Sequence, residues 1–143
     1  MKIWQRDVTI QDLQAKAKGT LLENIGIEFL EIGDDFIKAR MPVDSRTIQP
    51  YGILHGGASV SLAETLGSVA GSLSIDNSKE RCVGLEINAN HIHPVNSGFV
   101  CGIVKPMHIG KMTQIWEIKI HDEKNKLICI SRITMAVLKN EKK

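Results

Sequence analysis

The chain has 143 residues, of which 43% are hydrophobic and 24% are charged, and its formal net charge is +2. This length provides one hydrophobic core and is too short for two, so residues 1–143 are expected to form a single domain. The charge balance gives no reason to expect nucleic acid or an anionic membrane as a partner. The three cysteines lie far apart within apolar runs, which fits neither a disulfide framework nor a CxxC metal pattern and favours buried thiols in a reducing cytoplasm.

No segment has the composition of a membrane anchor or a signal peptide. The N-terminus, MKIWQRDVTI, has charges where a signal peptide needs an apolar stretch. The long and nearly uncharged segment from Leu54 to Ile75 contains five serines, four glycines and a glutamate, and is too polar for a membrane span. The sequence therefore predicts a soluble protein with no membrane partner.

The first predicted elements are a helix and a strand hairpin. Apolar residues at helical spacing predict a helix over Thr9 to Lys18, with Thr9 as its N-cap. Alternating apolar residues then predict strands around 27–29 and 37–43, and Gly33-Asp34-Asp35 between them has turn chemistry.

A long helix follows the polar loop 44–53. Leucines and a valine form one apolar row over about five turns, and small residues occupy much of the remaining surface. A helix with almost no charge on any face is a buried one, so this helix is predicted to form the core.

Four further strand patterns complete the chain, at 83–89, 99–103, 116–120 and 127–138. The last pattern is apolar at both odd and even positions, so both faces of the strand are apolar, as expected of a strand in the sheet centre. The order of two strands, one long helix and four strands predicts an α+β fold, in which a single sheet wraps around one helix.

Glu64 is the only formally charged residue between Leu54 and Ile75. Glutamates are usually exposed, so a solvated strip is the simpler interpretation. A solvated helix face, however, normally carries several charges. Thr65 and Ser68 also lie at helical spacing from Glu64, where a hydroxyl can hydrogen-bond the carboxylate or a water. This context favours a carboxylate that acts as a base or a nucleophile.

The helix begins at His55-Gly56-Gly57, where free backbone N–H groups and the helix dipole favour an anion or oxyanion. The simpler alternative is a flexible helix entry. Gly56 and Glu64 are separated by roughly 12 Å along the helix axis, too far for both to act on one carbonyl carbon. If both act on the same substrate, they come from different subunits of a dimer.

The run Gln49 to Ser68, QPYGILHGGASVSLAETLGS, resembles the active-site segment of the hotdog thioesterases. It is most similar to the branch that contains the glutamate-type 4-hydroxybenzoyl-CoA thioesterase, dihydroxynaphthoyl-CoA hydrolase and the enterobactin-pathway proofreading thioesterase. The likeness extends to 84–91 and 109–111 and so covers nearly the whole chain. It implies an α+β hotdog domain, an antiparallel sheet around one long central helix, in a homodimer with shared active sites that pairs into a homotetramer.

The same resemblance implies hydrolysis of an aromatic acyl-CoA, with 1,4-dihydroxy-2-naphthoyl-CoA as the leading candidate and no cofactor. Glu64 would be the nucleophile or the general base, and the backbone N–H of Gly56 would polarise the thioester carbonyl. Gln49 and His55 would position that carbonyl from the subunit opposite Glu64. Ser68, one turn beyond the carboxylate, would hold the attacking water.

Other residues are expected to contact the rest of the substrate. His91 and the Gly110-Lys111 turn would lie near the CoA moiety, where a cation and free N–H groups suit phosphate. His93 stands where relatives often carry arginine and is expected at the nucleotide end of CoA. Val69 would border the acyl pocket.

Two other functions and one other substrate remain open. An acyl-thioester dehydratase or hydratase of the same fold would pair a histidine with its carboxylate, but His55 lies about half a turn around the helix from Glu64. A non-catalytic acyl-CoA sensor would need an attached DNA-binding segment, for which this chain has no room. Acyl-carrier-protein thioesters are alternative substrates. A metal site at His91 and His93 lacks further ligands at suitable spacing.

Overall fold

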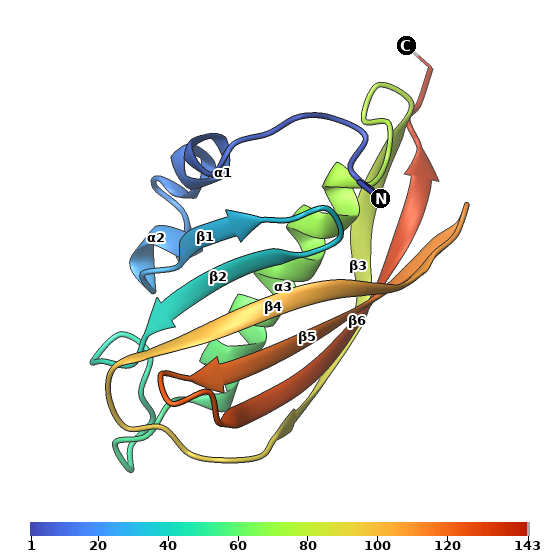
Figure 1. Ribbon diagram of the computed structural model, residues 1–143. Helices are drawn as coiled ribbons and strands as arrows, with labels where there is room; N and C mark the ends of the chain where they lie inside the picture. Colours follow the sequence, from blue (N-terminus) through green and yellow to red (C-terminus); the bar gives the residue numbers. More distant parts are fainter. Residues whose placement is uncertain (143) are drawn as a thin grey trace.

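The computed structural model describes residues 1–142, which form one antiparallel sheet curved around a long helix (Figure 1). The strand order across the sheet is β1-β2-β4-β5-β6-β3, so β1 and β3 are its two edges. The predicted α+β hotdog fold is confirmed. The elements, in chain order, are α1 (Ile10–Ala17), α2 (Leu21–Asn24), β1 (Glu28–Ile32), β2 (Ile37–Pro42), α3 (Gly56–Leu73), β3 (Glu80–His91), β4 (Phe99–Ile109), β5 (Thr113–Asp122) and β6 (Leu127–Lys139).

The N-terminal helix begins where its capping residues predict. The Thr9 side chain accepts the N–H of Asp12, and the Asp12 carboxylate accepts the N–H of Thr9, so the two form a capping box. The short helix α2 is not predicted by the apolar pattern, because four residues are too few to display a helical period.

All six predicted strands are present, and the largest difference in length is at β4. β1 and β2 pair as the predicted hairpin, and β6 lies between β5 and β3 as expected of a strand apolar on both parities. β4 continues to Ile109, beyond the predicted end at Ile103. Lys105 and Pro106 interrupt the apolar alternation, so the sequence pattern does not indicate that the strand continues. The proline is accommodated next to a bulge, because the register between β4 and β5 shifts between Pro106 and His108.

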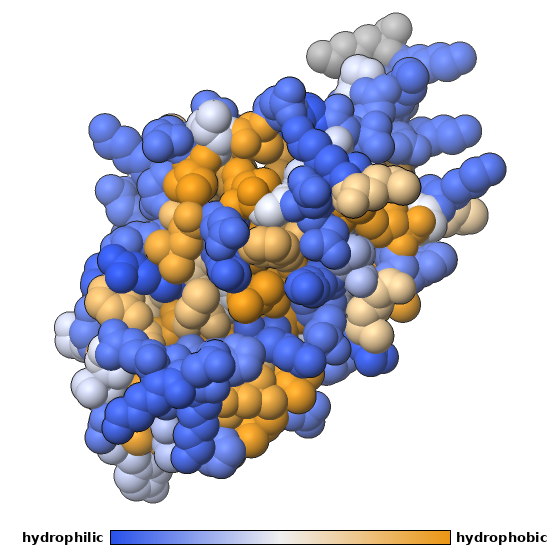
Figure 2. Space-filling model, viewed as in Figure 1, coloured by the Kyte–Doolittle hydropathy of each residue, from blue (hydrophilic) through white to orange (hydrophobic). Residues whose placement is uncertain are grey.

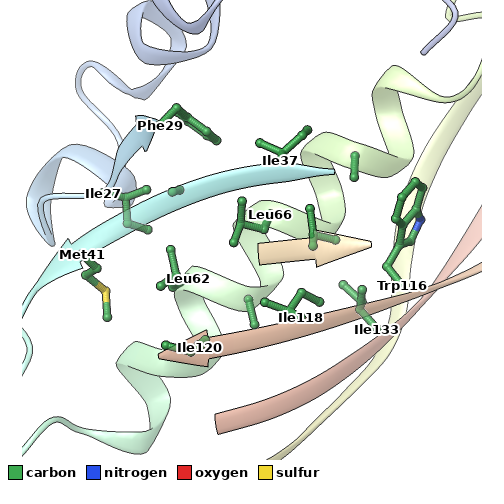
Figure 3. Close-up of a cluster of buried hydrophobic side chains, with 14 of the residues drawn as sticks. Ile27, Phe29, Ile37, Met41, Leu62, Leu66, Trp116, Ile118, Ile120 and Ile133 are labelled. Carbon is green, nitrogen blue, oxygen red and sulfur yellow. The ribbon is translucent and has the colours of Figure 1, made fainter. Parts of the chain in front are cut away.

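One face of α3 forms the centre of the core. Leu62 and Leu66 on this face are fully buried among side chains of β2 and β5 (Figure 3). Glycines allow α3 to approach the sheet closely: a Cβ on Gly67 would lie 2.5 Å from Cγ2 of Ile133, and one on Gly71 would lie 2.9 Å from Sγ of Cys82. The small residues of the helix therefore serve backbone packing, as their pattern indicates.

The opposite face of α3 is only half-buried, which differs from the prediction of a helix buried on every side. This face consists of Ser61, Glu64, Thr65 and Ser68. Two of its hydroxyls hydrogen-bond to carbonyls of the preceding helical turn: Ser61 donates to the carbonyl of Gly57, and Thr65 donates to that of Ser61. A helix face that is poor in charge and open in one copy of the chain is available for contact with another molecule.

The outer face of the sheet, turned away from α3, mixes apolar and charged side chains (Figure 2). Ile103, Ile115 and Ile130 are half-buried there. Ion pairs join neighbouring side chains, including Arg40 with Glu28. No helix within residues 1–142 combines the length and the apolar character that crossing a bilayer requires.

Candidate active site

The start of α3 presents an unpaired backbone donor. His55 is the N-cap, and its Nδ1 accepts the N–H of Gly57 at 2.8 Å. The N–H groups of Ala58 and Ser59 bond to the carbonyl of His55, whereas that of Gly56 has no acceptor within residues 1–142. Because Nδ1 of His55 accepts, a neutral ring carries its proton on Nε2. A free N–H at the positive end of the helix dipole suits a developing oxyanion.

A cavity of about 460 Å³ lies beside this helix start. The imidazole of His91 covers Gly56, where an added Cβ would lie 2.8 Å from its Nε2, so the glycine makes room for the ring. Nδ1 of His93 lies 2.9 Å from the carbonyl oxygen of Leu127 and must donate to it, because a carbonyl only accepts. Predicted site residues that line this cavity are Gln49, Gly56, His91 and His93.

Gln49 is held by its own loop. Its side-chain Oε1 accepts the backbone N–H of Tyr51, and its backbone N–H donates to the carbonyl of Ile53. This arrangement engages the carboxamide oxygen and leaves the Nε2 group as a donor at the cavity wall.

Glu64 lies near the middle of α3 and is half-buried. Its Oε1 accepts a hydrogen bond from Oγ of Ser68 at 3.3 Å. The same oxygen rests against the backbone of Gly84 in β3, where an added Cβ would lie 3.0 Å away. Within the described part of the chain, Glu64 has no ion-pair partner, and its Oε2 accepts no hydrogen bond. The predicted contact between Ser68 and the carboxylate is therefore present.

Apart from His55 at the N-cap and Val69, the predicted site residues fall into three groups. Gln49, Gly56, His91 and His93 share the cavity at the start of α3, whereas Glu64 and Ser68 lie further along the helix. Gly110 and Lys111 line a second cavity, of about 420 Å³, together with Ser74 at the far end of α3. Val69 packs against the core. It lies about 140° around the helix from Glu64, by the angular period.

The helix and the edge strand run antiparallel. His91 lies against Gly56, and Gly84 lies against Glu64 further along α3. Sequence reasoning missed the contact between Gly84 and Glu64. A glycine inside an alternating strand pattern is the available signal, because such a glycine often marks a bulge or the close approach of another group.

The cysteines are free thiols, and none suits a nucleophile. Cys129 is buried, but Cys82 and Cys101 are half-buried, which corrects the prediction that all three are buried. Burial raises the pKa of Cys82 to about 11 and also raises the pKa of Cys101 and of Cys129. A thiol with a raised pKa forms little of the reactive thiolate at neutral pH.

Comparison with known proteins identifies the family. The family model described as "Thioesterase superfamily" matches residues 51–129. The chain belongs to the thioesterase superfamily. It is 52% identical to the 1,4-dihydroxy-2-naphthoyl-CoA hydrolase of Escherichia coli, over 95% of this chain and 99% of that protein. It is 49% identical to the proofreading thioesterase EntH of Cronobacter turicensis, over 95% of this chain and 98% of that protein.

Solved structures agree with this assignment. A mutant thioesterase from Pseudomonas aeruginosa superposes with a TM-score of 0.95 at 43% identity and covers 97% of this chain and 100% of its own. A thioesterase from Haemophilus influenzae gives a TM-score of 0.93 at 46% identity, over 96% of this chain and 95% of its own. This thioesterase superfamily member is a thioester hydrolase with the hotdog fold.

Proposed function

We propose that this thioesterase hydrolyses aromatic acyl-CoA thioesters to the free acid and CoA, with 1,4-dihydroxy-2-naphthoyl-CoA as its leading substrate. The observation that carries the proposal is the 52% identity, along nearly the whole chain, to the Escherichia coli hydrolase of that compound. The half-buried carboxylate of Glu64, which has no cationic partner within residues 1–142, supports a role in attack on the thioester.

The proposed chemistry divides between the two oxygens of Glu64. Ser68 holds Oε1, which leaves Oε2 to attack the carbonyl carbon or to take a proton from the attacking water. On the direct route, an acyl–glutamate anhydride forms and water then cleaves it. On either route, the bond from the carbonyl carbon to sulfur breaks, and CoA leaves as a thiolate that is then protonated. Ser68 would also hold the attacking water.

The carbonyl oxygen would be stabilised at the start of α3. The unpaired N–H of Gly56 is the main donor, and developing negative charge also gains from the helix dipole. Nε2 of Gln49 and Nε2 of His55 are further donors that would position the carbonyl. A preorganised donor of this type contributes a rate factor of about 10²–10³ in other hydrolases.

The two halves of this site would come from different subunits. Gly56 and Glu64 stand roughly 12 Å apart along one helix, yet both are needed at one carbonyl. In the proposed dimer, the β3 strands of two subunits would pair antiparallel about a two-fold axis near Ile87–Asn88. Gly84 would then lie opposite the partner's His91. Because Glu64 lies against Gly84 and Gly56 lies against His91, Glu64 of one subunit would face the partner's Gly56. The exposed apolar side chains of β3 and the open face of α3 support this dimer.

The same axis would assemble the CoA site. It brings the cavity that contains Gly110 and Lys111 towards the partner's cavity that contains His91 and His93. Phosphate groups of CoA would then meet a lysine, free N–H groups and two imidazoles at one position. The aromatic acyl group would lie between the two copies of α3, with Val69 near its pocket. We further propose a cytoplasmic enzyme whose dimers pair into a tetramer through the outer sheet face.

Thiol release tests the reaction. Wild-type protein should release thiol rapidly from dihydroxynaphthoyl-CoA, less rapidly from benzoyl-CoA and least from a medium-chain acyl-CoA. Glu64→Gln should lower kcat by at least about 10³-fold, since the amide can neither attack nor act as a base. Full activity in a folded Glu64→Gln variant would remove this residue from the mechanism, and absence of release from every wild-type assay would overturn the proposed function.

Mixed dimers test the shared site. Glu64→Gln and Gln49→Ala subunits are each expected to be poorly active alone. When they are mixed and reassembled, a heterodimer regains one site with both native residues, so thiol release should rise well above the mean of the two parents. Activity that stays at that mean would show that each site is built within one subunit.

A further inference from the structure

Gly84 lies in the interior of β3, where a residue with a side chain is normally expected. Its φ is not among the positive values, so no left-handed backbone conformation requires a glycine here. The glycine is therefore not required by the strand geometry. Glycine in a strand interior weakens the strand, and a common reason for it is the close approach of another group.

The group that approaches is the carboxylate of Glu64. A Cβ built on Gly84 would lie 3.0 Å from Oε1, which is nearer than an ordinary van der Waals contact. The next atoms it would meet are Cδ of Glu64 and Cδ1 of Ile133, both at 4.0 Å. The carboxylate oxygen is thus the one atom that a methyl group at this position would displace.

The same oxygen is held on its other side by Ser68, whose Oγ donates to it at 3.3 Å. β3 also changes register at this point, with a bulge between Gly84 and Glu86 that leaves Leu85 62% exposed. Bulges bend a strand locally and occur often beside active sites. Ser68, the bare backbone of Gly84 and the adjacent bulge together form a notch for one oxygen of Glu64.

We infer that Gly84 is a positioning residue for Glu64. Its missing side chain lets Oε1 rest in the notch beside Ser68, which aims Oε2 away from β3. The catalytic consequence rests on the proposed function, whereas the position of the carboxylate does not. Filling the notch should move the carboxylate by a few tenths of an ångström or more and weaken its bond to Ser68.

Kinetics of Gly84→Ala and Gly84→Val test the consequence. We expect kcat to fall about tenfold with alanine and further with valine, because small misplacements of a catalytic group are costly. KM should change less than kcat, since Gly84 itself makes none of the proposed contacts to the substrate. Unchanged kcat in both variants, or a change confined to KM, would overturn the inference.

Shortening the carboxylate provides a second kinetic test. Glu64→Asp withdraws the oxygens from the notch and should itself reduce kcat. If the added methyl acts through the carboxylate, Gly84→Ala should reduce kcat much less in the Glu64→Asp background than in the native one. Equal fold-reductions in both backgrounds would show that Gly84 acts by another route.

A matched glycine separates positioning from packing. Gly67→Ala adds the same methyl group 2.5 Å from Ile133 in the core, so it should lower the Tm as well as the activity. Gly84→Ala should leave the Tm nearly unchanged, and a loss as large as that of Gly67→Ala would indicate a packing role. A crystal structure of Gly84→Ala decides the geometry even if wild-type protein releases no thiol: a displaced carboxylate supports the inference, and an unmoved one overturns it.

Discussion

The two edge strands of the sheet differ in what covers their backbone. At the β1 edge, the side chain of Gln14 in α1 reaches the strand backbone, where Nε2 donates to the carbonyl of Ile27 at 3.1 Å and Oε1 accepts the N–H of Phe29 at 2.9 Å. The carboxamide thus takes the place of a neighbouring strand. At the β3 edge, β6 is the strand partner within residues 1–142, and Val83 and Leu85 are 38% and 62% exposed.

This difference leaves one edge of the sheet protected and the other edge open to a second chain. An open edge offers unpaired N–H and C=O groups to any other chain, and proteins usually cover such an edge. Here the helix α1 covers one edge, while the other remains available beside Glu64. Both edge strands contain a bulge with an exposed leucine, Leu30 in β1 and Leu85 in β3, which provides a matched pair for experiment.

The largest effect is expected from a charge on the open edge. Leu85→Lys should prevent two β3 strands from pairing, because a lysine on an edge strand opposes further strand addition. The proposed dimer should become a monomer in light scattering, and thiol release should fall by at least about 100-fold as the proposed shared sites separate. Leu30→Lys makes the same change on the covered edge and should alter neither property more than about twofold. Similar behaviour of the two variants would remove the distinction between the edges.

A smaller effect is expected from opening the covered edge. Gln14→Ala removes the two hydrogen bonds to Ile27 and Phe29, and should lower the free energy of unfolding by about 2 kcal/mol in denaturant titrations at fixed protein concentration. Gln11→Ala, on the same helix, changes an exposed side chain that has no hydrogen bond within residues 1–142 and should cost less than about 0.5 kcal/mol. Equal losses would show that Gln14 does not support the edge.

The smallest effect concerns the capping box of α1. The N–H of Thr9 donates to the Asp12 carboxylate and lowers its pKa below the ordinary value of 3.8. Because the folded-state pKa is depressed, this stabilisation is present above about pH 4 and is lost as the pH falls through the lowered pKa. Asp12→Asn should therefore be less stable than wild type at about pH 7, and the difference in Tm should shrink as the pH falls below about 4 in thermal melts. A difference that persists at low pH would contradict this origin.

Much of the fold follows from local patterns. The period of apolar residues predicts all six strands and the long helix, because each pattern records which side of an element meets the core. The helix α2 and the end of β4 escape this reasoning, since the former is too short and the latter continues through Lys105 and Pro106. The bulge near Pro106 is a tertiary accommodation that the periodicity does not record.

The site was accessible from sequence only in part. Glu64 stands out as a lone charge in a neutral helix, and Ser68 is within one helical turn of it, so their contact follows from spacing. The contact of His91 with Gly56, and that of Gly84 with Glu64, joins a strand to a helix that precedes it in the chain. Such contacts depend on the path of the chain between them, which no local pattern encodes.

The sequence by itself determined the order of the six strands and the long helix, the apolar row of α3 and the identity of the lone carboxylate, because these depend on spacing within a single element. Only the tertiary structure decided which edge of the sheet is covered, through Gln14, and which group occupies the space beside Gly84. Both depend on the distance between elements that are remote in the chain. Beside Gly84, that distance is set by how closely glycine-rich α3 packs against the curved sheet.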